Sequence, residues 1–396
     1  MSLRAAFEDI LSDENLINPV TDMSETEISE VLEEVQESAN EVDKTEEMVE
    51  ILEEESAALE SILETVAAKE DGMTQGEARL FSAAIESIAR RCYIPDATRL
   101  VPAIESYADG QDRLAASLEA ADSGKNILVR MYEAIKAALL KMYNSIKDFF
   151  KSFGKSVEAL RAGSLNLRKR AEAVIDTGKT KAGKVKAKSF ANTLSVDGEF
   201  KVSYLTDGKV LIDTLDAMKA TTNARKEIVK EIISIEKWPE GTDMDTKKKE
   251  MEGRVQKVLG KLQMPGGYTM QASFGRFALK QEGKDFGDLE VDGIAPGNIG
   301  TLCAKIERLA AGIKMEAGNA EQNDKAVLSA LEKAKTIVNA EGAIAKTKLK
   351  FVEMHARWAQ SGVAAVPARA ATIAKAMIAF GNASCAAAVG EAAADA

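Results

Sequence analysis

The stretch that decides the fold is residues 125–162, KNILVRMYEAIKAALLKMYNSIKDFFKSFGKSVEALRA. Bulky side chains recur in it at alternating intervals of four and three, which predicts one long amphipathic α-helix. Lysines and arginines occupy its other faces. Such a helix can pack in a helical bundle, lie on an anionic membrane or enter a partner's groove. The ten stripe positions, nine of them apolar, are Leu128, Tyr132, Ile135, Leu139, Met142, Ile146, Phe149, Phe153, Ser156 and Leu160.

A second basic segment follows directly, residues 164–190, SLNLRKRAEAVIDTGKTKAGKVKAKSF. Its glycines and lack of bulky apolar residues predict a flexible basic linker, suited to nonspecific phosphate contact through counterion release. We expect the helix and this linker to bind DNA together. The cations predicted to face DNA are Lys125, Arg130, Lys136, Lys141, Lys147, Lys151, Arg168, Lys169, Arg170, Lys179, Lys181, Lys184, Lys186 and Lys188.

Charge is unevenly distributed along the 396 residues, whose net charge is −11. Residues 1–120 hold 30 acidic and 8 basic side chains, whereas residues 121–190 hold 6 acidic and 16 basic ones. The remainder is nearly neutral. These segments are solvated helix faces that happen to differ in sign, or the two ends have different partners, or the acidic part masks the basic part before use.

The acidic part carries a seven-residue apolar repeat between Ile28 and Val66, typical of a coiled-coil helix. Asp22 and Ser24 are candidate N-caps, and further helices are predicted at 74–91 and 97–118. The repeat can be buried in a hairpin within one chain or by self-association. Its two stripes are Ile28, Val35, Val42, Val49, Ser56 and Leu63, and Val31, Ser38, Thr45, Leu52, Leu59 and Val66.

The C-terminal half predicts a small α+β domain followed by helices, so the fold class expected is mainly α. Alternating apolar residues around Asp207-Gly208 predict a β-hairpin over residues 199–214. The last 34 residues contain 16 alanines and predict a packed helix and not a membrane span. Further predicted elements are helices at 215–238 and 245–262, strands at 268–279 and 289–291, and helical structure over 300–361.

The expected organisation is therefore an acidic helical arm, a basic helix with its linker, the α+β domain and a C-terminal helical region with an Ala-rich tail. Their predicted bounds are 1–120, 121–190, 191–300 and 301–396.

Few residues are suited to catalysis or metal binding. The chain has one histidine, His355, and three widely separated cysteines, which argue against a zinc site or a disulfide framework. Gly178-Lys179-Thr180 is not a phosphate loop, because Ala173 stands where the first glycine is needed. No nucleophile elbow, HExxH or GxGxxG pattern occurs. The sequence thus predicts no catalytic, cofactor or metal site and a non-enzymatic protein.

The segment YEAIKAALLKMYNSIKDFFKSFGKSVEALR, residues 132–161, resembles internal head proteins of large tailed bacteriophages. The resemblance implies a virion structural protein made in the host cytoplasm and incorporated inside the capsid. Its implied partners are packaged DNA, capsid or scaffold proteins and a head maturation protease. That protease would remove an acidic N-terminal propeptide after a small-X-Glu tripeptide.

Among several such tripeptides, Ser117-Leu118-Glu119 has a physical argument in its favour. Cleavage after Glu119 removes a net charge of −22 and changes the remaining chain from −11 to +11. An acidic precursor repels DNA, whereas a basic product attracts it. Two alternatives stay open at this stage: a membrane-active ejected protein that inserts the 125–162 helix, and an enzyme within residues 191–300.

Overall fold

The computed structural model describes residues 23–67, 73–92, 110–238, 242–260, 263–273, 275–282, 285–341 and 343–390. It is mainly helical, as expected, with small antiparallel sheets. The chain forms two compact units: unit 1 comprises Met1–Ala39 and Ile146–Ala396, and unit 2 comprises Asn40–Ser145. Two long helices, α2 (Glu25–Ala67) and α4 (Gly110–Asp176), contribute residues to both units.

Helix α2 begins where the sequence predicts, at Ser24. The backbone N–H of Ser24 donates to the Glu27 carboxylate (2.7 Å), and the Glu27 N–H donates to the Ser24 hydroxyl (3.2 Å). This reciprocal capping box satisfies two backbone donors that a helix start otherwise leaves unpaired. The Glu27 carboxylate accepts hydrogen bonds from the backbone N–H and the hydroxyl of Ser24, and these bonds lower the pKa of the Glu27 carboxyl.

Unit 2 contains the second part of α2, helix α3 (Gln75–Arg91) and the first part of α4. The repeat positions Val42, Val49 and Leu59 of α2 are fully buried. Arg91, at the end of α3, forms an ion pair of 2.7 Å with Glu55 of α2. The apolar repeat is therefore covered within a single chain, as the intramolecular alternative requires.

Helix α4 joins two helices that the sequence analysis expected to be separate. The segment between residues 118 and 125 continues the helix, because Gly124 alone does not end a strongly periodic pattern. The described part of the predicted stripe is buried at Met142, Ile146, Phe149 and Phe153. This burial matches the bundle interpretation of the 125–162 helix, and α4 runs without interruption through Gly154.

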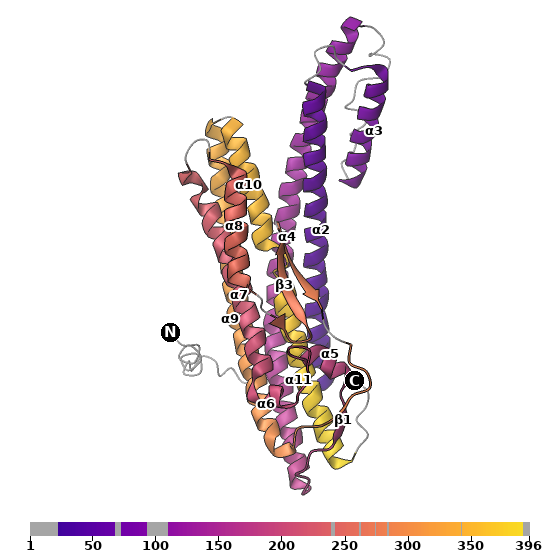
Figure 1. Ribbon diagram of the computed structural model, residues 1–396, viewed down its shortest axis with the longest axis vertical. Coiled ribbons are helices and arrows are strands. Elements are labelled where there is room, and N and C mark those ends of the chain that lie inside the picture. Colours follow the sequence, from indigo (N-terminus) through magenta and orange to yellow (C-terminus); the bar gives the residue numbers. More distant parts are fainter. Residues whose placement is uncertain are drawn as a thin grey trace. The chain divides into compact units, whose positions relative to one another are not determined.

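The body of unit 1 is a helical bundle (Figure 1). Helix α7 (Lys209–Ser234) packs on α8, α9 and α10, and α9 also packs on α10 and α11. Apolar residues three and four apart on each helix supply the core, among them Ile228 of α7, Val255 of α8 and Val352 of α10. The remaining helices of the bundle are α8 (Met244–Leu259), α9 (Ile299–Glu341), α10 (Ala343–Gln360) and α11 (Ala365–Val389).

The predicted β-hairpin at residues 199–214 is wrong. Helix α6 (Ser203–Asp207) ends at Gly208, whose φ of +89° is left-handed, and α7 starts at Lys209. Val210, Leu211, Thr214 and Leu215 are buried, a spacing of three and four that follows a helix face. The Asp-Gly pair therefore separates two helices and does not connect two strands.

The strand predicted over 268–279 is instead two strands separated by a turn that includes Gly275, and the strand predicted over 289–291 is confirmed. Strands β2 (Gln263–Met264), β3 (Tyr268–Ser273) and β4 (Arg276–Gln281) form an antiparallel sheet in the order β2-β3-β4. Strand β1 (Lys184–Lys186) pairs antiparallel with β5 (Glu290–Asp292). The shorter helical elements are α5 (Lys188–Leu194), η4 (Ile235–Lys237) and η5 (Pro296–Asn298).

The alanine-rich C-terminal helix is a core element of unit 1. The helical region Phe351–Val389 is long and apolar enough to cross a membrane, but 61% of its most apolar stretch is buried inside the chain. Small side chains on α11 allow close packing: a Cβ at Gly381 would lie 2.5 Å from a Leu167 methyl carbon of α4. Core packing thus accounts for the apolar composition of α11.

Two glycine substitutions test this packing in opposite directions. At Gly154, in α4, an added Cβ meets nothing within 4 Å, whereas at Gly183 it would lie 2.1 Å from the backbone oxygen of Ala387. We expect Gly154→Ala to stabilise the protein by up to about 1 kcal/mol, because alanine favours the helix. Gly183→Ala should destabilise the protein by about 2 kcal/mol or more, because the added Cβ has no room. Thermal and denaturant unfolding measure both changes, and equal effects would contradict the packing described.

Candidate nucleic-acid interface

The second half of α4 presents lysines outward from the bundle core of unit 1. Lys147 and Lys151 are exposed. Phe149 and Phe153, on the other side of the helix, are buried, and their ring centroids are 5.2 Å apart. The i, i+4 spacing aligns the lysines on one helix face. In unit 2, Lys141 is likewise exposed. The predicted cations Lys125, Arg130 and Lys136 belong to α4, but their side chains lie outside the described residues.

Residues 177–190, in the predicted linker, form a lysine-rich surface between α4 and α5. Five lysines and no acidic residue occur here, and all five are exposed: Lys179, Lys181, Lys184, Lys186 and Lys188. Part of this segment is ordered as strand β1, because Val185 is buried between Lys184 and Lys186. The alternation of a strand places these two lysines on the same outward side. The flexible linker predicted for residues 164–190 is wrong over its first half, because residues 164–176 continue helix α4. Its last turns include the remaining predicted cations, Arg168, Lys169 and Arg170.

Several of the predicted cations are already paired with carboxylates. Lys184 forms an ion pair of 2.9 Å with Asp292 on the neighbouring strand, and this hydrogen bond raises the pKa of the lysine. Arg168 pairs with Glu307 at 3.1 Å, and Arg170 with Glu25 at 3.8 Å. Exposed pairs of this kind contribute little to stability, but each carboxylate competes with an incoming anion for its cation.

Another group of lysines is exposed and has no ion pair within 4 Å among the residues that the structure describes. Two of them lie on α4, and the other four lie within residues 177–190. Since their ammonium groups remain hydrated and accessible, they are the strongest candidates for phosphate contact. These lysines are Lys147, Lys151, Lys179, Lys181, Lys186 and Lys188.

The first four turns of α2 lie antiparallel along the second half of α4. The Ser152 hydroxyl donates to that of Ser38 (3.3 Å), and Lys155 pairs with Glu34 (3.5 Å). At the other end, the Asn166 side-chain amide donates to the backbone oxygen of Met23 (2.8 Å). The sequence did not predict that the start of α2 packs on the second half of α4, because the two were expected to belong to separate parts of the chain. Their opposite charge and matching apolar stripes were the available signal.

The apolar face of the 125–162 helix is not available to a membrane where it is described. Phe149 is fully buried, Phe153 is 1% exposed and Met142 is fully buried. Insertion of this face into a bilayer would require it to leave the bundle core. The geometry therefore favours a role for the cationic side of α4 over a role for its apolar side.

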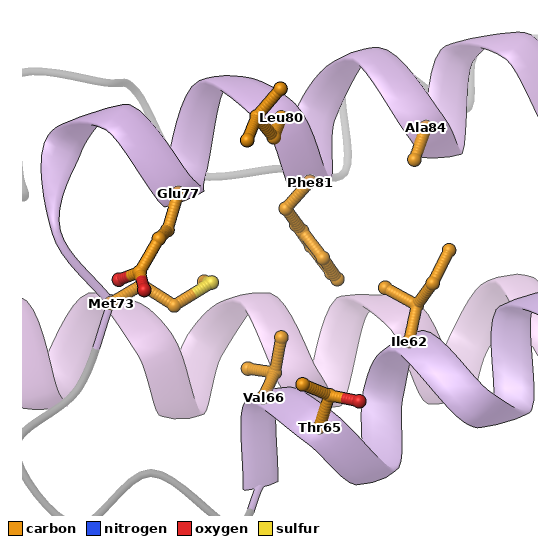
Figure 2. Close-up of a pocket in the computed structure, with 8 residues that line it drawn as sticks. All are labelled: Ile62, Thr65, Val66, Met73, Glu77, Leu80, Phe81 and Ala84. Atoms are coloured by element: carbon orange, nitrogen blue, oxygen red, sulfur yellow. The ribbon is translucent and has the colours of Figure 1, made fainter.

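An apolar pocket of about 330 Å³ lies between the end of α2 and α3 in unit 2 (Figure 2). Its acidic residue, Glu77, accepts hydrogen bonds from the N–H (2.8 Å) and hydroxyl (3.0 Å) of Thr74, as part of the cap of α3. The pocket lining therefore offers little for polar ligand chemistry. It consists of Ile62, Thr65, Val66, Met73, Glu77, Leu80, Phe81 and Ala84.

Histidine and cysteine are common in active sites, and in this chain the side chains of both types are buried. His355 is fully buried, and burial lowers its pKa to about 4. Burial also raises the pKa of the Cys92 thiol to about 11 and that of the Cys303 and Cys385 thiols. Within the part of the chain that the structure describes, no three His, Cys, Asp or Glu side chains are grouped to hold a metal ion.

The candidate cleavage tripeptide Ser117-Leu118-Glu119 lies inside α4. Ser117 is buried, and its hydroxyl accepts a hydrogen bond of 2.7 Å from the backbone N–H of Met73. Proteases cleave exposed, extended segments more readily than helices. Cleavage at this position therefore requires α4 to unwind locally or to be cut before it forms.

Comparison with known proteins adds a family to these observations. A family model described as phiKZ-like phage internal head proteins matches residues 23–383. The match spans both units and includes α2, the basic half of α4, the lysine-rich segment and nearly all of α11. No curated protein and no solved structure matches the chain.

Proposed function

This chain belongs to the phiKZ-like phage internal head proteins, structural proteins of the virion head, and on that premise we propose that it binds packaged DNA nonspecifically through the exposed lysines of α4 and residues 177–190. The observation that carries the proposal is the group of exposed lysines without ion pairs in the described chain. A protein enclosed with DNA at high density meets phosphate at every orientation.

The chemistry of these side chains favours phosphate contact without base recognition. Lysine ammonium groups neutralise phosphates and release condensed counterions, which gives affinity with no dependence on sequence. Phe190, the aromatic residue of the 177–190 segment, is buried and so is not placed to stack on bases. The proposal therefore includes a non-enzymatic role in which electrostatics provides the affinity.

Substitution of three lysines tests the DNA proposal. In the full chain, Lys179→Ala, Lys181→Ala and Lys188→Ala together should weaken binding to duplex DNA at low salt. The slope of log K against log salt should become shallower by about 3, because about 0.9 counterions are released per phosphate contact. Fluorescence anisotropy at several salt concentrations measures the slope.

A matched control separates this surface from net charge. The control is the triple alanine variant of Lys201, Lys230 and Lys247, which removes the same positive charge. Each of these lysines pairs with a nearby glutamate, so we do not expect it to contact DNA. The control should leave the slope nearly unchanged. Equal losses in the two triple variants, or a wild-type chain with no salt-dependent affinity for DNA, would contradict the proposal.

We further propose that the protein enters the head with its acidic N-terminal part and is matured by proteolysis after Glu119, with capsid or scaffold proteins as partners during assembly. The charge reversal from −11 to +11 supports this step, because the product, once separated from the acidic part, would be attracted to DNA. Contacts of residues 25–39 with α4 and α11 mean that one cut does not by itself release the acidic helix.

The intact mass of the denatured chain from mature particles tests maturation. We expect a product that begins at Ala120, and we expect Glu119→Gln to prevent its formation while Glu158→Gln does not. A chain from mature particles that still includes residues 25–119 in covalent linkage would contradict the proposed cleavage.

A further inference from the structure

The exposed side of α2 over its first four helical turns is rich in glutamate and is called here its glutamate face. Residues 25–37 contain six glutamates and no basic residue, and all six are exposed. Two of them reach α4: Glu34 pairs with Lys155, and Glu25 pairs with Arg170. The glutamates are Glu25, Glu27, Glu30, Glu33, Glu34 and Glu37.

The opposite face of α2 holds the helix in place. Ile28, Leu32 and Val35 are buried, and an added Cβ at Gly163 of α4 would lie 3.7 Å from Ile28 and 2.9 Å from Ile378. Ser29 accepts a hydrogen bond of 3.2 Å from the Lys375 ammonium of α11. Since apolar burial contributes more than an exposed ion pair, α2 should stay docked when its glutamates lose their partners.

The two ion pairs between α2 and α4 are therefore not required to hold α2 in place. The side chains of Lys155 and Glu34 are 58% and 49% exposed, and the pair distances of 3.5 and 3.8 Å are long. Such pairs are weak in water and are screened by salt. A phosphate can replace the carboxylate at each cation, but it must approach a face that carries six negative charges.

We propose that the glutamate face of α2 acts as an internal competitor of DNA, occupying Lys155 and Arg170 and lowering the affinity of the second half of α4 for duplex DNA. This inference rests on the proposed DNA binding and deepens it, because it names the element that regulates the site. The carboxylates of α2 stand where DNA phosphates would otherwise lie. Loss of α2, or neutralisation of its glutamates, makes the two cations available.

The test uses the full chain with Glu25→Gln and Glu34→Gln. Glutamine keeps the side-chain length and suits a helix, so the fold should be retained. The control, Glu54→Gln with Glu64→Gln, changes the same net charge on exposed positions of the same helix in unit 2. Binding to duplex DNA is measured by anisotropy between 50 and 200 mM salt.

We expect the Glu25/Glu34 variant to gain about two phosphate contacts. Its salt slope should steepen by about 1.8, so its advantage over the wild type should shrink about tenfold between 50 and 200 mM salt. The control should change both quantities much less. Equal gains in the two variants, or no gain in either, would overturn the inference. The proposed function would still hold if the wild-type chain binds duplex DNA with the expected dependence on salt.

A second measurement reports on the ion pair without relying on affinity. A zero-length carbodiimide reagent should link Glu34 to Lys155 in the free wild-type chain, and DNA should reduce the yield of that linked peptide. If the link forms and the wild-type chain binds no DNA, both the proposed function and the competition fail, although the pairing is correct. If DNA binds and the yield does not change, the competition alone fails.

Discussion

The antiparallel packing of α2 on the second half of α4 is the interaction that joins the acidic and basic segments of unit 1. It buries the apolar stripe of a strongly acidic helix against the apolar stripe of a strongly basic one, with Ile28 near Gly163 and Ile378. Neither helix can bury its own stripe. The contact therefore explains why charges that are segregated along the sequence lie side by side in the folded chain.

Because α2 packs on α4, the uneven distribution of charge along the sequence acts locally in the folded chain. An acidic arm separate from the body would act on DNA only through the net charge of the protein. Residues 25–39 instead belong to the same compact unit as the basic half of α4, and their carboxylates reach individual cations. The electrostatic effect is then local and can be tested residue by residue. It also means that the proposed cleavage would not by itself release the acidic helix.

Sequence patterns predicted the elements that have strong periodicity. The stripe that includes Met142, Ile146, Phe149 and Phe153 is buried as expected, and the Ser24 cap is in place. The hairpin at Asp207-Gly208 failed because a glycine with positive φ can end a helix as well as turn a strand, and the 3.6-residue spacing from Val210 onward outweighed the local alternation. The pairing of Ser38 with Ser152 was not predicted, because a helix period shows that a stripe is covered but not which helix covers it. Only the opposite charge of the two segments pointed to it. For the candidate interface, sequence identified the cations and the structure distinguished Lys184, paired with Asp292, from Lys179 and Lys181.

Cysteine crosslinking between α2 and α4 tests the central claim most directly. The hydroxyl oxygens of Ser38 and Ser152 are 3.3 Å apart, so cysteines at both positions should form a disulfide under mild oxidation. With a mixture of isotopically labelled and unlabelled chains, mass spectrometry distinguishes links within one chain from links between chains. We expect a disulfide within one chain that joins residues 38 and 152. The absence of this link, or a link found only between two chains, would contradict it.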